Sequence, residues 1–184
     1  MKTFEQAVIT ESDINQHLTV LLKYSLQSDS VVEIGLGRTS NAVRAFIKGC
    51  LNVISYDIDP MPEVVEDVRQ YANHIGCYWQ FRLQDSTTKP IPECDFLFID
   101  GEHSYYAVSK ELKMHSPNVR KFIGFHDVVS YANRNESPYE TGSRFIEGIV
   151  PAIFEFLQDN PQWKVDYYSP LNNGLLILKN EIIR

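Results

Sequence analysis

Acidic and histidine side chains stand directly after several apolar runs of this chain. Asp57, Asp85 and Asp100 each follow a run that is typical of a β-strand, and His126-Asp127 follows another. Because the carboxyl ends of parallel strands meet at one edge of an open α/β sheet, where ligands bind, we expect these side chains to lie close together. A single acid at a strand end often only caps the next helix. Four or five such residues along one edge indicate a binding or catalytic site.

Two of these carboxylates could hold a metal ion. The strands before Asp100 and Asp127 are expected to be neighbours, and carboxylate oxygens suit a hard cation such as Mg²⁺. An imidazole ligand from His126 would shift the preference toward softer ions such as Mn²⁺, Fe²⁺ or Zn²⁺. The alternative is that Asp127 caps a turn and that His126 is a hydrogen-bonded histidine at the edge of the core.

His103 is a candidate general base. It follows Asp100 by three residues in a turn, where a neutral imidazole near pH 7 could take a proton from a substrate hydroxyl. A hydroxyl bound to a cation would already be more acidic, so base and cation would act together. The plainer alternative is a turn histidine bonded to the backbone. The remaining histidines, His17, His74 and His115, are expected to face solvent.

A glycine turn follows the first apolar run, which covers residues 31–34. Gly35 and Gly37 tolerate positive φ and let a ligand approach the backbone closely. Thr39 or Ser40 could cap the following helix, whose free N–H groups would then point toward a ligand over the glycines. This order of strand, glycine turn and helix predicts a nucleotide-binding cradle.

Further polar residues extend this predicted cradle. Asp57 lies about as far beyond the glycine turn as the acid that binds ribose hydroxyls in dinucleotide folds, although Asp59 could take that role. Asp85 and Ser86 could bond to an adenine edge or could form only a polar turn. Glu33 is a carboxylate within an apolar strand and must find donors. The nearby turn amides would supply them, so Glu33 could position the loop rather than touch the ligand.

Strands and helices alternate along the chain, which is typical of a parallel sheet with helices on both faces. A capping box at Thr10-Glu11-Ser12-Asp13 predicts one helix before the first strand. The loop 169–174 is too short for a crossover helix, so the last two strands should form an antiparallel hairpin. These patterns predict a Rossmann-like, doubly wound seven-stranded α/β sheet that is mostly parallel. Its strands are expected at 31–34, 51–56, 78–83, 95–100, 122–125, 163–168 and 175–179.

The chain is expected to form one domain over residues 1–184, with a helical extension at 1–29. The polar and aromatic stretch 128–143 is long for a connection in a compact domain and is predicted to be a substrate lid, with a disordered surface excursion as the equal alternative. A helix should follow from about residue 144 to 157, divided at Pro151. The N-terminal helix could close over the site, pack on the sheet or form a contact in a homo-oligomer. The lid residues that could stack on or bond to a substrate are Tyr131, Arg134, Tyr139 and Arg144.

Composition limits the partners and the location that we expect. The net charge of −7 and the pI near 5.2 offer no basic face for nucleic acid. The three cysteines lack paired spacing, and no apolar run stands at the N-terminus. We therefore expect a reduced, cytoplasmic protein without a membrane span.

Over residues 30–179 the chain resembles the class I S-adenosylmethionine-dependent methyltransferases. Residues 33–37 look like the first motif of that family, Asp57 like the acid that holds the ribose, and Asp85-Ser86 like the adenine contact. The terminal hairpin distinguishes that fold from ordinary dinucleotide-binding domains. The resemblance implies a methyltransferase domain with S-adenosylmethionine as its cofactor. The expected cofactor-binding residues are Glu33, Gly35, Gly37, Thr39, Ser40, Asp57, Ile58, Asp85, Ser86 and Asp100.

Two further segments resemble one branch of that family, the metal-dependent small-molecule O-methyltransferases of the macrolide-sugar and cephalosporin pathways. The segments are 98–105, which reads Phe-Ile-Asp-Gly-Glu-His-Ser-Tyr, and 124–127, which reads Gly-Phe-His-Asp. The resemblance implies that Asp100 ligates a divalent metal such as Mg²⁺ or Mn²⁺ and that His103 acts as base. His126 departs from the pattern, which has an acid at that position. The implied reaction is methyl transfer to a hydroxyl of a small-molecule acceptor, a sugar or a phenol, while the residues alone leave methyl transfer to a nitrogen open.

Two other classes of protein remain open. A NAD(P)-dependent Rossmann oxidoreductase would use the same glycine turn and Asp57, although Arg38 does not suit a pyrophosphate fingerprint and the terminal hairpin is unexpected there. A non-catalytic S-adenosylmethionine-binding protein would keep the cofactor pocket without turnover. Binding of S-adenosylhomocysteine or of NADH separates the oxidoreductase from the methyltransferase.

Overall fold

Seven strands form one mixed sheet in the computed structural model, which describes residues 1–136 and 147–182. The strands are β1 (Val31–Ile34), β2 (Asn52–Asp57), β3 (Tyr78–Leu83), β4 (Cys94–Ile99), β5 (Val119–His126), β6 (Trp163–Ser169) and β7 (Leu175–Asn180). Their order in the sheet is β3-β2-β1-β4-β5-β7-β6. The first five strands pair in parallel, whereas β7 runs antiparallel between β5 and β6. The predicted doubly wound sheet with its C-terminal hairpin is confirmed.

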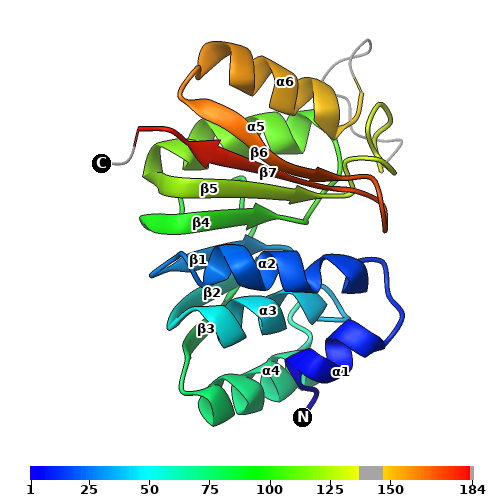
Figure 1. Ribbon diagram of the computed structural model, residues 1–184, viewed down its shortest axis with the longest axis vertical. Coiled ribbons are helices and arrows are strands. Elements are labelled where there is room, and N and C mark those ends of the chain that lie inside the picture. Colours follow the sequence, from blue (N-terminus) through cyan, green and yellow to red (C-terminus); the bar gives the residue numbers. More distant parts are fainter. Residues whose placement is uncertain (137–146, 183–184) are drawn as a thin grey trace.

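Helices cover both faces of this sheet (Figure 1). One face carries α1 (Phe4–Ile9), α2 (Leu18–Ser25), α3 (Asn41–Gly49) and α4 (Pro62–Ile75). The other face carries α5 (Tyr105–His115) and α6 (Ile149–Asp159), so each side of the sheet has its own apolar core. Short 3-10 turns, η1 (Asn15–His17) and η2 (Ser116–Asn118), precede α2 and β5. Within the described ranges, no helix has the length and apolar character needed to cross a membrane.

The glycine turn after β1 is fixed against the strands on both sides. Gly35 has a φ of 87°, and its N–H donates to the Tyr56 carbonyl at 2.9 Å. The Asp100 N–H donates to the Ile34 carbonyl at 2.9 Å, which brings the turn after β4 against the glycine turn. A Cβ atom on Gly35 would lie 2.0 Å from the Asp100 carbonyl oxygen. This position therefore requires glycine both for its φ and for the close approach of Asp100.

The N-terminal region differs from the single predicted helix. It folds as α1 and α2 with an irregular segment between them, because the capping box lies at Thr3 and Gln6. The Thr3 hydroxyl accepts from the Gln6 N–H, and the Gln6 side chain accepts from the Thr3 N–H. Residues 10–13 therefore do not begin a helix. They run past the carboxyl edge of the sheet, where the Asp13 carbonyl oxygen lies 3.1 Å from Nε2 of His126.

The helix after the predicted lid begins at Ile149. Pro151 therefore lies in the first turn, where its missing N–H needs no partner, and the prediction of a helix divided at this proline is wrong. Of the predicted lid and this helix, residues 137–146 lie outside the described part of the chain, and Tyr139 and Arg144 with them.

Candidate functional site

Two adjoining hollows open at the carboxyl edge of the sheet. The first, the Asp57 hollow, has a volume of about 470 Å³ and is lined by the glycine turn, the end of β2 and the loop after β3. The second, the His103 hollow, has a volume of about 400 Å³ and reaches from the glycine turn to residues 13–14 and Asn173. A ligand in one hollow would adjoin a ligand in the other. The residues that line both hollows are Gly35, Gly37, Asp100, Gly101 and Glu136.

Backbone donors hold the Asp57 carboxylate in place. The Gly37 N–H donates to its Oδ2 at 3.1 Å, and the Asp59 N–H donates to its Oδ1 at 2.9 Å. Asp59 lines neither hollow, and its own carboxylate pairs with Arg38 at 2.6 Å. Of the two acids that could bind a ribose, the structure therefore places Asp57 in the hollow.

Asp85, Ser86 and Ile58 also line the Asp57 hollow. The Asp85 carboxylate accepts from the Thr87 N–H at 2.7 Å and so fixes its own turn. The Ser86 hydroxyl donates to Oε1 of Glu111 at 2.5 Å. The Ile58 side chain is 77% exposed, which offers an apolar surface suited to a flat ring. The hollow thus combines a carboxylate, an apolar wall and polar groups.

Glu33 lies away from both hollows. It is fully buried, and the Ser55 hydroxyl donates to its Oε2 at 2.5 Å. Its Oε1 has no hydrogen-bond partner among the described residues. The prediction that the turn amides satisfy this carboxyl is wrong, because the Gly35 N–H donates to a backbone carbonyl instead. Burial raises the pKa of Glu33 well above its ordinary value, which favours the neutral carboxylic acid.

No hydroxyl of the described residues caps α3, although the sequence offers Thr39 and Ser40 for that role. Ser40 is the N-cap residue of α3, at a φ of 46°, but its hydroxyl makes no cap bond and instead accepts from Nη2 of Arg44 at 3.1 Å. Ser40 lines neither hollow, whereas Thr39 lines the His103 hollow. The expected capping of α3 by a hydroxyl is wrong for Ser40, because this side chain satisfies a buried guanidinium.

Four side chains converge where β4 and β5 end. Asp100 and Asp127 directly follow these strands, His126 ends β5, and His103 belongs to the turn before α5. Nε2 of His103 lies 3.4 Å from Oδ1 of Asp100 and 3.2 Å from Oδ2 of Asp127. Nδ1 of His126 lies 3.2 Å from Oδ1 of Asp100 and 3.3 Å from Oδ2 of Asp127. The structure thus brings two imidazoles onto the same two carboxylates.

Each of these histidines has its other ring nitrogen beside an acceptor. Nε2 of His126 lies 3.0 Å from the Asn172 carbonyl oxygen, and Nδ1 of His103 lies 2.9 Å from Oε2 of Glu136. Burial lowers the pKa of both rings, but the cluster carboxylates outweigh it and raise the pKa of His103 to about 9 and that of His126 to about 11. Burial also opposes ionisation of Asp100, yet the histidines hold its pKa well below the ordinary value. Without a cation, the cluster is therefore two imidazolium ions beside two carboxylates.

The same donor set fits a divalent cation. One ligand atom from each of Asp100, His103 and Asp127 lies within 4.8 Å of the others. Nε2 of His103 and Oδ1 of Asp127 are buried without a hydrogen-bond partner in the described part of the chain, and a bound ion would satisfy both. Imidazole and carboxylate ligands together favour Mn²⁺, Fe²⁺ or Zn²⁺ over Mg²⁺. The converging histidine is His103, whereas the sequence names His126 as the metal ligand. Because Nδ1 of His103 lies beside Glu136, its Nε2 can serve either as a third ligand or as a base beside an ion held by Asp100 and Asp127, and not as both at once.

The first residues of the predicted lid pack on His103. The Tyr131 ring stacks on the imidazole, with centroids 4.9 Å apart and planes 7° apart. The Arg134 guanidinium lies 5.3 Å from the centroid of the Tyr131 ring. The Glu136 N–H donates to the His103 carbonyl at 3.0 Å, in addition to the contact of its carboxylate with the ring. Sequence reasoning missed Glu136, because no pattern marks a glutamate in a polar loop 33 residues away from His103.

Two histidines that were expected to face solvent are buried. His17 is 1% exposed, and its ring lies edge-on to that of His126 with centroids 5.9 Å apart. His115 lies on α5 without exposed surface. Burial lowers the pKa of both. Only His74 is exposed, because the spacing along a helix does not reveal which polar residues other elements will cover.

Glu111 is a buried carboxyl that the sequence does not single out. It lies on α5, is 1% exposed and lines the Asp57 hollow. Its Oε1 accepts from the Ser86 hydroxyl, and its Oε2 has no partner among the described residues. Burial raises the pKa of Glu111 to about 7, and the nearby Asp85 carboxylate adds to this effect. Sequence reasoning missed it because a glutamate on a helix with Lys110 and Lys113 is typical of a solvated face.

The raised pKa of Glu111 predicts a pH-dependent stability. Folding favours the protonated carboxyl, so this stabilisation is fully present below the unfolded pKa of about 4.3 and is lost as the pH rises through about 7. Glu111→Gln cannot ionise. We therefore expect its free energy of unfolding, relative to that of the wild type, to be about 2–3 kcal/mol higher at pH 8 than at pH 4. Urea unfolding of the ligand-free protein measures this, with the exposed Glu66→Gln as control. The same difference at both pH values would contradict the raised pKa.

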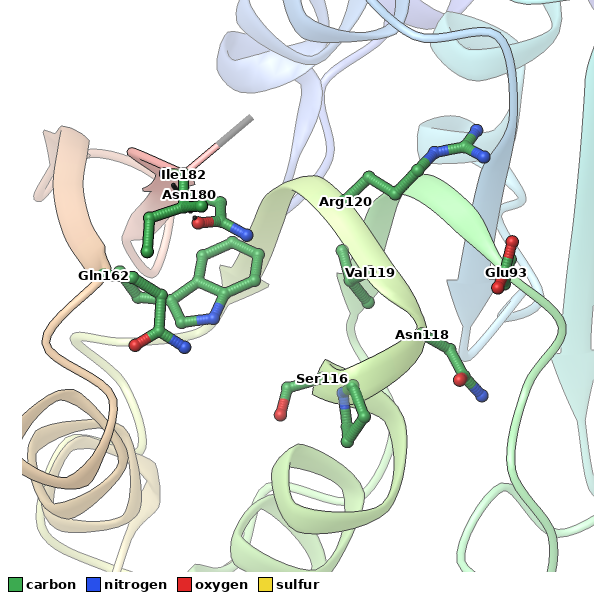
Figure 2. A pocket seen from close by; sticks show the side chains of 10 residues that line it. Glu93, Ser116, Asn118, Val119, Arg120, Gln162, Asn180 and Ile182 are labelled. Carbon is green, nitrogen blue, oxygen red and sulfur yellow. Dashed lines mark hydrogen bonds between the residues drawn. The ribbon is translucent and has the colours of Figure 1, made fainter. Parts of the chain in front are cut away.

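A larger hollow lies at the opposite edge of the sheet. It has a volume of about 640 Å³ and opens at the amino ends of β4 and β5. Figure 2 shows the amide side chains of Asn118, Gln162 and Asn180 around it. Among the described residues that line it, the charged ones are Glu93 and Arg120, and Arg120 pairs with a buried aspartate. We therefore place the candidate site at the carboxyl edge, where the titratable groups converge.

The sheet order, the reversed β7 and the strand-end hollows define a Rossmann-like methyltransferase fold, and solved structures agree. An O-methyltransferase from Bacillus cereus in complex with S-adenosylhomocysteine superposes with a TM-score of 0.62 at 15% identity, over 94% of this chain and 83% of that one. A methyltransferase from Podospora anserina bound to S-adenosylhomocysteine gives 0.60 at 13% identity, over 97% and 82%. The N-methyltransferase NodS from Bradyrhizobium japonicum WM9 gives 0.57 at 16% identity, over 92% and 97%. No protein-family model and no curated protein matches the sequence, so the likeness establishes the fold alone.

Proposed function

We propose that this protein is an S-adenosylmethionine-dependent methyltransferase that transfers a methyl group to a hydroxyl of a small molecule, a sugar or a phenol, with a divalent metal ion. The observation that carries the proposal is that the two hollows adjoin. Asp57 and the glycine turn line one hollow, His103 and Asp127 line the other, and Asp100 lines both. A cofactor in the first hollow and an acceptor in the second would therefore meet beside Asp100.

We assign cofactor binding to the Asp57 hollow. The Asp57 carboxylate, fixed by two backbone donors, would accept from the ribose hydroxyls. Gly35 and Gly37 leave the backbone open to close approach, and Asp85 and Ser86, which line the same hollow, would border the adenine. S-adenosylmethionine supplies an electrophilic methyl group on a positively charged sulfur.

We assign proton removal from the acceptor hydroxyl to His103. Glu136 bonds to one ring nitrogen and Tyr131 stacks on the ring, so the imidazole is held in one orientation. In the cation-free cluster its pKa of about 9 keeps the ring protonated at pH 7, and it could not accept a proton. Asp100 and Asp127 would hold a divalent cation, whose positive charge would lower the pKa of both His103 and the acceptor hydroxyl. Base and metal are therefore required together.

Alignment of the two reactants is the other contribution of the protein. The His103 hollow is bordered by Asp13 and Ile14 from the N-terminal region and by Tyr131 from the predicted lid. These segments hold the acceptor beside the cofactor and exclude water. In-line attack of an oxygen on a sulfonium methyl group needs little more than this positioning, which is a large part of many enzymatic accelerations.

A methyl-transfer assay tests the proposal. S-adenosylmethionine labelled in its methyl group is incubated with monosaccharide and phenol acceptors, with Mn²⁺, with Mg²⁺ or with EDTA. We expect label on a hydroxyl oxygen only when metal is present, and transfer at least about 100-fold slower in His103→Ala. His74→Ala, on the exposed side of α4, should act at the wild-type rate. Transfer that is unchanged by EDTA and by His103→Ala would contradict the metal requirement and the role of His103 as base. Label on a nitrogen atom would contradict the assignment of a hydroxyl acceptor.

Tyr131→Ala should weaken acceptor binding and leave cofactor binding almost unchanged. Tyr131 lines the His103 hollow but not the Asp57 hollow, and its ring stacks on His103. Loss of the ring is expected to raise the KM for the acceptor by about 10-fold, with the Kd of S-adenosylhomocysteine within about twofold of the wild type. Tyr131→Phe keeps the stacking and should remain close to the wild type. An equal loss of both affinities would show that this segment is not part of an acceptor lid.

A further inference from the structure

Glu111 has one carboxyl oxygen bonded and the other unused. Oε1 accepts from the Ser86 hydroxyl at 2.5 Å, while Oε2 is buried without a partner among the described residues. The side chain is 1% exposed and yet lines the Asp57 hollow. An acceptor buried without a donor is destabilising, so a ligand that brings a donor to this wall would gain affinity.

The nearby groups among residues 1–136 and 147–182 do not supply that donor. On the same helix, the Lys110 ammonium lies 3.5 Å from the Thr87 hydroxyl. His115, one turn further along α5, also has a ring nitrogen, Nε2, without a partner in the described part of the chain, so it does not reach Glu111. The hollow is therefore the side from which a donor can come.

We propose that Glu111 accepts a hydrogen bond from the 6-amino group of the cofactor's adenine and so selects adenine over a 6-oxo purine. This inference rests on the proposed function, since it takes the Asp57 hollow as the nucleoside site. The amino group is a donor and suits the unused oxygen, whereas a 6-oxo group is an acceptor and would leave it unpaired. A site built to bond one polar group rejects an analogue that lacks it more strongly than an apolar pocket does.

The kinds of groups that line the hollow support this assignment. Asp57 suits the ribose hydroxyls, and Ile58 follows it with an exposed apolar side chain. Ala107 lines the hollow one helical turn before Glu111, so the two lie on the same face of α5. A ribose acid, apolar surfaces and a buried acceptor match the ribose, the flat ring and the amino group of adenosine.

Calorimetric titration with S-adenosylhomocysteine and with its 6-oxo analogue, S-inosylhomocysteine, tests the proposal at about pH 8.5, where the Glu111 carboxyl is ionised and both of its oxygens only accept. The wild type should prefer the adenine compound by about 100-fold. Glu111→Gln, whose amide can donate to an oxo group, should bind S-adenosylhomocysteine about 10-fold more weakly and S-inosylhomocysteine no more weakly. The preference should therefore fall to about 10-fold or less. Glu66→Gln makes the same chemical change on the exposed side of α4 and should keep the wild-type preference.

The outcomes separate the inference from the function on which it rests. If the wild type binds neither compound, the proposed function fails and this inference fails with it. If the wild type binds both compounds equally, or if Glu111→Gln keeps the full preference, the role of Glu111 is refuted while the cofactor assignment stands. Should Glu111→Gln fail to fold, Ser86→Ala provides the second variant, because it removes the hydrogen bond that orients the Glu111 carboxyl and should therefore also reduce the preference.

Discussion

Replacing Asp100 by asparagine should destabilise the metal-free protein by about 3 kcal/mol. Asp100 faces both His103 and His126 through the same Oδ1 atom, and His126 is 1% exposed. The substitution removes one of the two carboxylates that neutralise two imidazolium ions, so it leaves buried positive charge without its partner. The expected loss lies at the lower end of the range for buried ion pairs, since the Asp100 side chain is 20% exposed.

Chemical denaturation at pH 7 in EDTA measures this loss, and uptake of Mn²⁺ by the folded variant gives a second readout. Asp100 is one of the three residues whose ligand atoms converge, so we expect the affinity for Mn²⁺ to fall by more than about 100-fold. Asp159→Asn makes the same chemical change at an exposed position at the end of α6 and should alter neither property. Wild-type stability together with wild-type metal uptake in Asp100→Asn would refute both roles of the cluster.

Gly35→Ala should destabilise the protein by about 2–5 kcal/mol, far more than Gly37→Ala. Both glycines have positive φ, 87° and 65°, so both substitutions carry the backbone strain of the left-handed region. Only the new Cβ at position 35 would collide, at 2.0 Å from the Asp100 carbonyl oxygen, whereas that at position 37 meets no atom within 4 Å. The difference between the two variants therefore isolates the contact of the glycine turn with Asp100.

Urea unfolding of the two variants gives this difference. We expect the free energy of unfolding of Gly37→Ala to be about 1 kcal/mol lower than that of the wild type, which is the cost of a positive φ alone. Because the collision must shift either the glycine turn or Asp100, Gly35→Ala should also lose affinity for S-adenosylhomocysteine. Equal destabilisation in the two variants would show that the close approach of Asp100 does not constrain Gly35.

The centre of the sheet was predictable from the sequence because its strands β1 and β4 are buried on both faces and are followed by the glycine turn and by Asp100. All four residues of β1 and all six of β4 are buried, and an apolar run of that kind has few alternatives to a central strand. The N-terminal region was not, because residues 10–13 and the pair Thr3 and Gln6 both carry a capping signature. Which signature begins a helix depends on packing against α3, and local residue types do not contain that information.

The site was predictable only in part. Asp100, His103, His126 and Asp127 were named because strand ends share an edge, and their distances follow from the parallel pairing of β4 and β5. Their charge states were not predictable, since these depend on how deeply each side chain is buried and on the distances between the imidazoles and the carboxylates.

The burial of Glu111 was also not predictable from the sequence. Glu111 becomes buried because the loop after β3 covers α5 there, as its bond with Ser86 records. Helical periodicity indicates on which face of its own helix a residue lies. It does not indicate whether another segment of the chain covers that face. A polar residue that is buried by a distant segment of the chain is therefore the kind of site residue that a single sequence does not reveal.

The most direct test of the account is a thermal-shift titration with S-adenosylhomocysteine and with NADH, on the wild type, Asp57→Ala and Asp59→Ala. At a ligand concentration about a hundredfold above the Kd, binding should stabilise the wild type by roughly 2.7 kcal/mol and raise its Tm by about 5–10 °C. We expect this Tm shift with S-adenosylhomocysteine in the wild type and no shift in Asp57→Ala. Asp59→Ala should keep the shift, because the Asp59 carboxylate lies outside the hollow. A shift with NADH and none with S-adenosylhomocysteine would contradict the methyltransferase assignment and favour a nicotinamide-dependent oxidoreductase.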